Sequence, residues 1–466
     1  MGVTFDTKFI WNQHINKIIR RSEVTLAVVR RLYGNKWGLR PGMVHWLYTR
    51  VVRPALTYAA LVWWPKVMTT TTILKLSKIQ RIACLGITGA FKTTPTTALE
   101  VLLDLPPLEI VIKAEARMAL YRLQGKNTLE TETTGHCAIW RHVGDPIFGM
   151  VSDNMTPVHN IQNKFEVFVD RQTYNTHQST NPSDGLIWFT DGSKTEEGAG
   201  AGIYGEKPRK SFSFSLGKYT TVFQAEVYAI LQCAKENRRR AYKNKRIHIF
   251  SDSQAALKAL RCPKINSKLI AECLEELNAL ADQNQVKLIW VPGHCGIKGN
   301  EKADTLAKKG SATPLTGPEP ALGIPKGTAR EAIKKWIRQS HTQHWEKCPG
   351  GRQGKLFIKE PCKKRTEEIL KLNRLQIKTI TGLLSGHAPL KKHLNTMGLW
   401  NGNLDCRLCG ENIETAQHIV CSCAALDRRR HTLFGQSSLE PIEINNYPIV
   451  KSYQLVNKTG LFDWIN

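Results

Sequence analysis

Three rhythms of apolar and polar residues divide the chain. Over residues 1–130, apolar residues recur at helical spacing, as at Ile15, Ile18 and Ile19, with basic residues between them. This period predicts amphipathic helices, which prolines separate into short segments. Residues 131–184 are polar, rich in Thr and Asn and without long apolar runs. We therefore expect a linker there, with at most one short helix.

A different pattern begins near residue 185. Short apolar runs bounded by polar and Gly-containing turns predict neighbouring strands at 186–190, 200–204 and 211–215. The elements predicted after them are a helix bearing Phe223, Val227 and Ile230 on one face, a strand at 246–250, helices near 253–260 and 267–284, a strand at 286–291 and a helix at 300–309. This order indicates a layered α/β (α+β) domain on a mixed sheet over residues 185–312. Residues 313–466 open with a Pro- and Gly-rich passage and are then largely helical and basic.

The charge balance is strongly basic. The 466 residues include 66 Lys and Arg against 39 Asp and Glu, a formal net charge of +27. Such an excess favours a polyanionic partner over a merely solvated surface. Nucleic acid fits best, because its phosphates form a dense line of charge and release counterions when neutralised. The composition is that of a globular protein, and the length predicts two or three domains.

Membrane insertion and secretion are not expected. The chain has no run of about 18 apolar residues, and its first residues lack the basic-then-apolar order of a secretory signal. We therefore expect an intracellular protein, in the cytoplasm, the nucleus or both. Its 12 cysteines are then expected to be reduced thiols together with one metal site.

Four acidic residues stand in distinctive local settings. Asp191 and Asp252 each follow an apolar strand, whereas Glu226 lies one turn into a helix and Asp304 lies in the last predicted helix. Taken singly, Asp191 could hold a turn and Asp252 could cap a helix. Gathered beside one sheet, the four carboxylates would repel one another unless cations neutralise them. Because magnesium prefers oxygen ligands and phosphates, the set favours a two-magnesium phosphodiesterase site.

The same stretch resembles ribonuclease H of type 1. The likeness rests on Thr190-Asp191-Gly192-Ser193, on the spacing to Glu226 and Asp252, and on the segment 290–304, which reads Trp-Val-Pro-Gly-His-Cys-Gly-Ile-Lys-Gly-Asn-Glu-Lys-Ala-Asp. The resemblance implies a five-stranded mixed sheet flanked by helices. It also implies hydrolysis of the RNA strand of RNA–DNA hybrids with two magnesium ions.

The resemblance further implies roles for single residues. Asp191 would bridge both magnesium ions, and the other three carboxylates would complete their ligand shells. His294, ten positions before Asp304, is similar to the family's mobile histidine, which moves protons or helps to release product; a plain surface histidine is the alternative. Contacts to the hybrid, including its 2′-hydroxyls, are expected from Ser193, Gln224, Ser253 and Gln254.

The N-terminal flank resembles the end of the reverse transcriptase in jockey-like non-LTR retrotransposon polyproteins. The likeness lies in residues 2–15, 79–95 and 105–108. No adjacent Asp-Asp pair occurs in the chain, so the metal motif of a polymerase is missing and we expect no polymerase activity. The interpretation is a truncated element in which residues 1–130 are a thumb- or connector-like remnant. A catalytically idle, nucleic-acid-binding remnant is the alternative function.

A Cys/His cluster lies near the C-terminus. The spacing Cys406-x2-Cys409-x8-His418-x4-Cys423 is typical of tetrahedral zinc ligands. Cys421 competes with Cys423 for the fourth position, and a set of reduced cysteines in a helical tail is the alternative. The arrangement resembles the Cys/His segment that ends these retroelement polyproteins. We therefore expect one small zinc site at 406–423.

Overall fold

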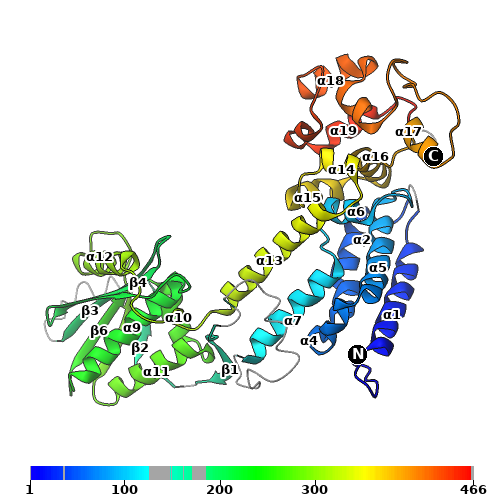
Figure 1. Ribbon diagram of the computed structural model, residues 1–466. Coiled ribbons are helices and arrows are strands. Elements are labelled where there is room, and N and C mark those ends of the chain that lie inside the picture. The colour runs from blue at the N-terminus through cyan, green and yellow to red at the C-terminus, as the bar shows by residue number, and fades with distance from the viewer. Residues whose placement is uncertain are drawn as a thin grey trace. The chain divides into compact units, whose positions relative to one another are not determined.

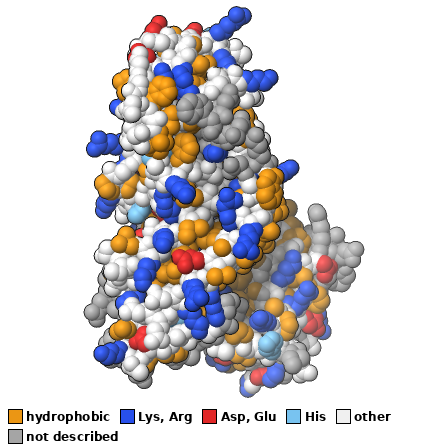
Figure 2. Space-filling view, turned by 90° about the vertical axis from the view of Figure 1, so that its right-hand side faces the viewer, with side chains coloured by type: hydrophobic (Ala, Val, Ile, Leu, Met, Phe, Trp, Pro, Cys, Tyr) orange, Lys and Arg blue, Asp and Glu red, His pale blue; other side chains and the backbone are white. Residues whose placement is uncertain are grey.

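The described residues form two compact units. The computed structural model describes residues 2–34, 37–124, 147, 150–160, 162–170 and 185–462. Met118–Ala332 form one unit, here called the sheet unit, and Met1–Arg117 with Ile333–Asn466 form the other, here called the helical unit (Figure 1). Within these ranges every helix is too short or too polar to cross a lipid bilayer. Lys and Arg side chains recur over the face drawn in Figure 2, where Asp and Glu are sparser, in keeping with the basic charge balance.

The sheet unit is built on a six-stranded mixed sheet. In spatial order its strands are β2 (Glu166–Phe168), β8 (Gln285–Trp290), β6 (Arg246–Ser251), β3 (Leu186–Lys194), β4 (Ala199–Lys207) and β5 (Lys210–Ser215). β2, β8, β6 and β3 run parallel, whereas β3, β4 and β5 form antiparallel pairs. The layered α/β prediction and the strands expected after residue 185 are confirmed.

The strand count differs from the expected five because of the segment predicted to be a linker. β2 pairs with β8 at the edge of the sheet, and β1 (Asn154–His159) pairs with β7 (Lys264–Ser267) in a separate two-stranded ribbon. A three-residue strand is too short to show an alternation in sequence. Most of the other residues of 131–184, including any short helix there, lie outside the described residues.

Helices cover both faces of the large sheet. Three of them lie on one face and a fourth on the other: α9 (Val222–Arg239), α10 (Gln254–Arg261) and α11 (Lys268–Ala281) against α12 (Lys298–Ala312) (Figure 1). Side chains alternate along a strand, so Trp188 packs into the core under α9 while its neighbours Ile187 and Phe189 pack against Ala303 of α12.

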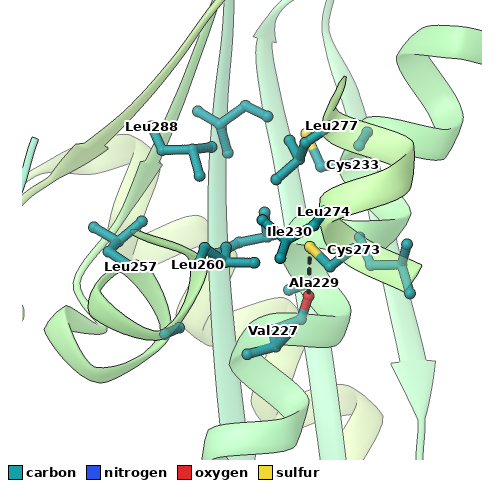
Figure 3. Close-up of a cluster of buried hydrophobic side chains, with 14 of the residues drawn as sticks. Val227, Ala229, Ile230, Cys233, Leu257, Leu260, Cys273, Leu274, Leu277 and Leu288 are labelled. Atoms are coloured by element: carbon teal, nitrogen blue, oxygen red, sulfur yellow. Dashed lines mark hydrogen bonds between the residues drawn. The ribbon is translucent and has the colours of Figure 1, made fainter. Parts of the chain in front are cut away.

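The main core lies between the sheet and α9, α10 and α11. Figure 3 shows Ile230 of α9 among leucines of α10, α11 and β8, with the Cys273 thiol directed at the Val227 carbonyl oxygen 3.9 Å away. The helices begin where side chains cap them. Thr221 forms a capping box for α9, and Ser253 and Ser267 accept hydrogen bonds from the first turns of α10 and α11.

The helical unit combines helices from both ends of the chain. Its N-terminal elements are α1 (Asn12–Arg30), α2 (Pro41–Leu47), η1 (Tyr48–Val52), α3 (Arg53–Thr57), α4 (Ala60–Trp63), η2 (Trp64–Met68), α5 (Thr70–Thr88), α6 (Thr96–Leu102) and the first part of α7 (Leu108–Gln124). Its C-terminal elements are most of α13 (Lys326–Lys347), α14 (Arg352–Phe357), α15 (Lys363–Lys371), α16 (Arg374–Ser385), α17 (Lys391–Thr396), η5 (His418–Ser422), η6 (Ala424–Leu426), α18 (Asp427–Phe434), η7 (Pro441–Asn446) and α19 (Ile449–Val456).

Buried polar contacts join these two sets of helices. The Arg374 guanidinium at the start of α16 donates to the carbonyl oxygens of Leu39 and Gly86 at 2.8–2.9 Å. The Thr366 hydroxyl of α15 donates to the Leu102 carbonyl oxygen at 3.0 Å. The described residues of Met1–Arg117 and Ile333–Asn466, which make up most of the regions expected at 1–130 and 313–466, therefore pack together as one unit. The apolar periodicity of a helix identifies which of its faces is buried, but it does not identify the distant segment that packs against that face.

Candidate active site

Two neighbouring parallel strands position Asp191 and Asp252. β3 and β6 pair as far as Thr190 and Ser251, so the next residue of each chain segment emerges at the same point of the sheet. The strand was predicted to stop just before Asp191, but β3 continues to Lys194 through antiparallel pairing with β4. The parallel partner of β3, β6, ends at Ser251 beside Thr190, which leaves room beside Asp191 for other side chains.

A close approach of α9 to β3 brings in Glu226. A Cβ atom on Gly192 would lie 2.5 Å from the Glu226 backbone nitrogen, so only glycine permits this approach. The capping box of Thr221 and Gln224 fixes where α9 begins and therefore which residue faces β3. Carboxylate oxygens of Asp191, Glu226 and Asp252 all lie within 4.8 Å of one another.

The cluster is electrostatically costly without cations. Asp191 and Glu226 are each only 6% exposed. Burial, followed by the charges of Asp252 and Asp304, raises the pKa of Asp191 to about 7. Burial, followed by the charges of Asp191 and Asp252, raises the pKa of Glu226 well above its usual value. Such shifts mark a site that disfavours several negative charges at once.

Asp304 lies near this cluster but is not one of the three carboxylates that fall within 4.8 Å of one another. It occupies the second turn of α12, and the Lys308 ammonium contacts its carboxylate at 2.7 Å. Its charge still contributes to the raised pKa of Asp191. Asn300, one helical turn earlier, is buried, and its side-chain amide donates to Asp252 Oδ2 at 3.2 Å. Sequence reasoning did not select Asn300, although its i,i+4 spacing to Asp304 places both on one face of the helix.

The predicted histidine lies on an exposed loop next to Asp252. A Cβ atom on Gly293 would be 2.8 Å from Asp252 Oδ2, so the loop passes directly over this carboxylate. His294 follows with a left-handed backbone (φ 53°) and is exposed. The Trp290 indole N–H donates to the Asp252 carbonyl oxygen at 3.0 Å and holds the base of the loop.

The four expected substrate contacts have different surroundings. Ser193 is half-buried in β3, two positions from Asp191 and so on the same side of the strand. Ser253 caps α10, and Gln254 Oε1 accepts from Lys258 at 3.1 Å. Gln224 is buried; its side chain closes the α9 capping box and donates to the Gly323 carbonyl oxygen at 2.8 Å. Gln224 therefore has internal partners that its sequence motif did not indicate.

A second possible metal group lies in the helical unit. One ligand atom from each of Cys406, Cys409, His418 and Cys423 falls within 4.8 Å of all the others. The Cys406 and Cys423 sulfurs are 3.9 Å apart, close to the separation of about 3.8 Å that Zn–S bonds of about 2.3 Å impose at a tetrahedral centre. Cys421 lies outside this group, and burial raises the pKa of its thiol to about 12.

Comparisons with known proteins agree with this arrangement. The RNase H family model matches residues 183–312. Ribonuclease H of Neisseria gonorrhoeae is 32% identical in an alignment of 145 residues that covers 27% of this chain and 93% of that protein. A 115 kDa protein of the type-1 retrotransposable element R1DM of Drosophila melanogaster is 26% identical over 113 residues, 24% of this chain.

The similarity to the retrotransposable-element protein is confined to one part of it, since the match spans 11% of that protein's length. Ribonuclease H of Methylobacillus flagellatus is 56% identical over a shorter stretch of 34 residues, which are 7% of this chain and 22% of that protein. The family match covers the chain from β3 to α12, and with it all four carboxylates. The Neisseria gonorrhoeae relative is itself a ribonuclease H and is matched over 93% of its length. Through residues 183–312, the chain belongs to the ribonuclease H family.

Proposed function

We propose that this chain hydrolyses the RNA strand of RNA–DNA hybrids by two-metal catalysis, as part of a retrotransposon-derived protein. The observation that carries the proposal is the convergence of Asp191, Glu226 and Asp252 within 4.8 Å. Two of these carboxylates are buried and have strongly raised pKa values. A cluster of this kind is stable in its ionised form only when cations neutralise it.

The donor set fits magnesium. All its ligands are carboxylate oxygens, which Mg²⁺ prefers, and within the described part of the chain Glu226 Oε2 is buried without a hydrogen-bond partner. Asp191, Glu226 and Asp252 would hold the ions, together with the neighbouring Asp304. When bound, the ions would activate the attacking water and stabilise the departing 3′ oxygen of the ribose.

The residues of the chain would hold and orient the reacting groups. Asn300 holds the Asp252 carboxylate through its amide, which fixes one ligand oxygen before substrate binds. The exposed His294 would exchange protons at the scissile phosphate or aid product release. Ser193, Ser253 and Gln254 are the proposed contacts to the hybrid, where 2′-hydroxyls distinguish RNA from DNA. Gln224, also expected to be a contact, is buried and would instead hold the start of α9. The products would carry a 5′-phosphate and a 3′-hydroxyl.

Cleavage of a labelled hybrid by the purified chain tests this function. Asp191→Asn should reduce Mg²⁺-dependent cleavage to background and keep or raise thermal stability, because it removes a buried charge that its neighbours repel. Asp282→Asn is the matched control, since Asp282 is exposed and ion-paired with Lys164 in the same unit. Equal cleavage by Asp191→Asn and wild type would contradict the proposal. A wild type that binds without cutting would support the idle remnant instead.

We also propose that the Cys/His cluster binds one zinc ion. Three sulfurs and one imidazole form the usual donor set of a structural zinc site. The Ser422 hydroxyl lies 3.4 Å from His418 Nδ1, which leaves Nε2, 3.3 Å from the Cys409 sulfur, directed into the cluster. A second partner of this kind fixes the tautomer of a ligating histidine.

A further inference from the structure

A pocket of about 920 Å³ lies in the helical unit, which contains none of the four carboxylates of the nuclease site. Its walls come from the start of α14, the connection between α16 and α17, α17 itself and residues 414–416 of the Cys/His segment. Pockets of roughly 300–1,000 Å³ suit small ligands and single groups of larger ones. The volume is therefore ample for one nucleotide.

The charges at this pocket favour an anion. Arg352 and Lys392 are exposed in its lining. Glu414 is its one acidic lining residue, and that side chain is fully buried and bound by the Arg407 guanidinium at 2.7 Å. The Arg407 side chain also donates to the Pro389 carbonyl oxygen at 2.9 Å. The carboxylate is thus neutralised while it ties the Cys/His segment to the start of α17.

Two histidines give the pocket flat and uncharged polar surfaces. The rings of His387 and His393 have centroids 4.5 Å apart, and the Thr93 hydroxyl lies 3.2–3.3 Å from a nitrogen of each. Burial, followed by the charges of His393 and Arg81, lowers the pKa of His387 to about 4. Burial also lowers the pKa of His393. The His393 ring also stacks on Phe91, with 6.1 Å between the centroids. At neutral pH the two rings therefore line the pocket as uncharged polar surfaces, while the positive charge stays at Arg352 and Lys392.

We infer that this pocket binds an unpaired nucleotide of single-stranded RNA or DNA, with Arg352 and Lys392 at its phosphates and His387 and His393 against its base. Basic side chains that follow a backbone beside flat rings that accept bases are the means by which proteins hold single strands. An inorganic anion would use the charged rim but not the neutral rings. This site goes beyond the proposed hybrid cleavage and does not depend on it.

Fluorescence anisotropy with the full chain tests the phosphate contacts. The probes are DNA and RNA single strands of about 12 nucleotides with the same sequence. Replacing Arg352 and Lys392 together by Ala should weaken binding about tenfold and lower the slope of log affinity against log salt by about 1.4. Lys78→Ala with Lys371→Ala is the matched control, because both lysines are exposed in the same unit and outside the pocket. Equal weakening by the two pairs would overturn the inference.

An abasic DNA strand of equal length tests the base contact. His387→Ala should weaken binding of the base-bearing strand about fivefold or more and leave the abasic strand unchanged. If wild type binds the base-bearing and the abasic strand equally, the pocket binds phosphates without contacting a base, and the inference fails. Cleavage of a blunt-ended hybrid, measured on the same variants, should stay at the wild-type level. The nuclease proposal is therefore judged separately, and thermal unfolding confirms that each variant is folded.

Discussion

At the scale of single residues, Gly192 lets the buried carboxylates of the sheet unit approach one another. A methyl group at this position would meet the Glu226 backbone nitrogen at 2.5 Å and the Ala225 carbonyl carbon at 2.8 Å. Neither atom can move without shifting α9. Overpacking of this kind costs about 1–3 kcal/mol. We expect Gly192→Ala to lower the free energy of unfolding by that amount and to reduce hybrid cleavage at least about tenfold.

Urea unfolding and a hybrid-cleavage assay would measure both effects. Gly327→Ala is the control, because Gly327 lies in the same unit near the start of α13 and has nothing within 4 Å of an added Cβ atom. Alanine favours a helix over glycine, so this control should be neutral or slightly stabilising. Wild-type stability and cleavage in Gly192→Ala would show that α9 can retreat without moving Glu226.

A buried acid in the helical unit makes stability depend on pH. Glu100 of α6 is 3% exposed and accepts a 2.7 Å hydrogen bond from the Gln80 side chain. Burial raises the pKa of Glu100 from 4.5 to about 8. Because the pKa of Glu100 is higher in the folded than in the unfolded state, its protonated side chain stabilises the fold. This contribution is full below the unfolded pKa of 4.5 and is lost as the pH rises through about 8. The loss reaches at most about 1.4 kcal/mol per pH unit.

Glu100→Gln should remove this pH dependence. The variant keeps the acceptor oxygen for Gln80 but carries no charge, so its advantage over wild type should grow from about pH 5 to about pH 8. Urea unfolding at several pH values is the measurement. Glu367→Gln serves as the control, because the Glu367 side chain is 61% exposed. An identical pH dependence in wild type and Glu100→Gln would mean that water reaches Glu100 in the folded protein.

At the scale of elements, the sequence identified what local spacing determines. Strands alternate every second residue and helices every third or fourth, so the sheet and the helices after residue 185 were predictable. The carboxylates were recognisable because each lies in a short motif. β2 was missed because three residues carry no period. The continuation of β3 past Asp191 depends on its pairing with β4, and the internal partners of Gln224 depend on Gly323, about 100 residues away. These are tertiary contacts, which local patterns do not specify.

The Cys/His segment permits a test of one ligand against its near neighbour. Cys423 belongs to the group of four ligand atoms, whereas Cys421, two residues earlier, lies outside it. We expect zinc content of about one ion per chain in wild type and in Cys421→Ser, falling below about half in Cys423→Ser. Elemental analysis after careful purification measures this. Full zinc in Cys423→Ser, or its loss in Cys421→Ser alone, would reassign the fourth ligand.

At the scale of the whole molecule, the net charge of +27 concerns the binding of substrate and not the chemical step at the carboxylates. A cluster of carboxylates repels a polyanionic substrate until cations bind, so attraction must come from basic residues elsewhere. Salt bridges use only some of these residues, as with Arg238 and Arg239 of α9, which contact Glu276 and Glu236. The excess of Lys and Arg over Asp and Glu is therefore available to bind phosphates. Such contacts weaken with salt because neutralised phosphates release counterions.

Binding of a hybrid to Asp191→Asn, which should not cut it, measures this attraction directly. Six or more phosphate contacts would lower affinity about 1,000-fold or more between about 50 and about 200 mM NaCl, with log affinity falling linearly with log salt. Each removed phosphate contact should reduce that slope by about one. A slope near zero would mean that the charge is not used on nucleic acid. An idle remnant would show the same steep slope, but its wild type would leave the hybrid intact with magnesium present. Steep salt dependence together with magnesium-dependent cleavage by wild type therefore identifies a nuclease whose basic surface gathers the substrate that its carboxylates process.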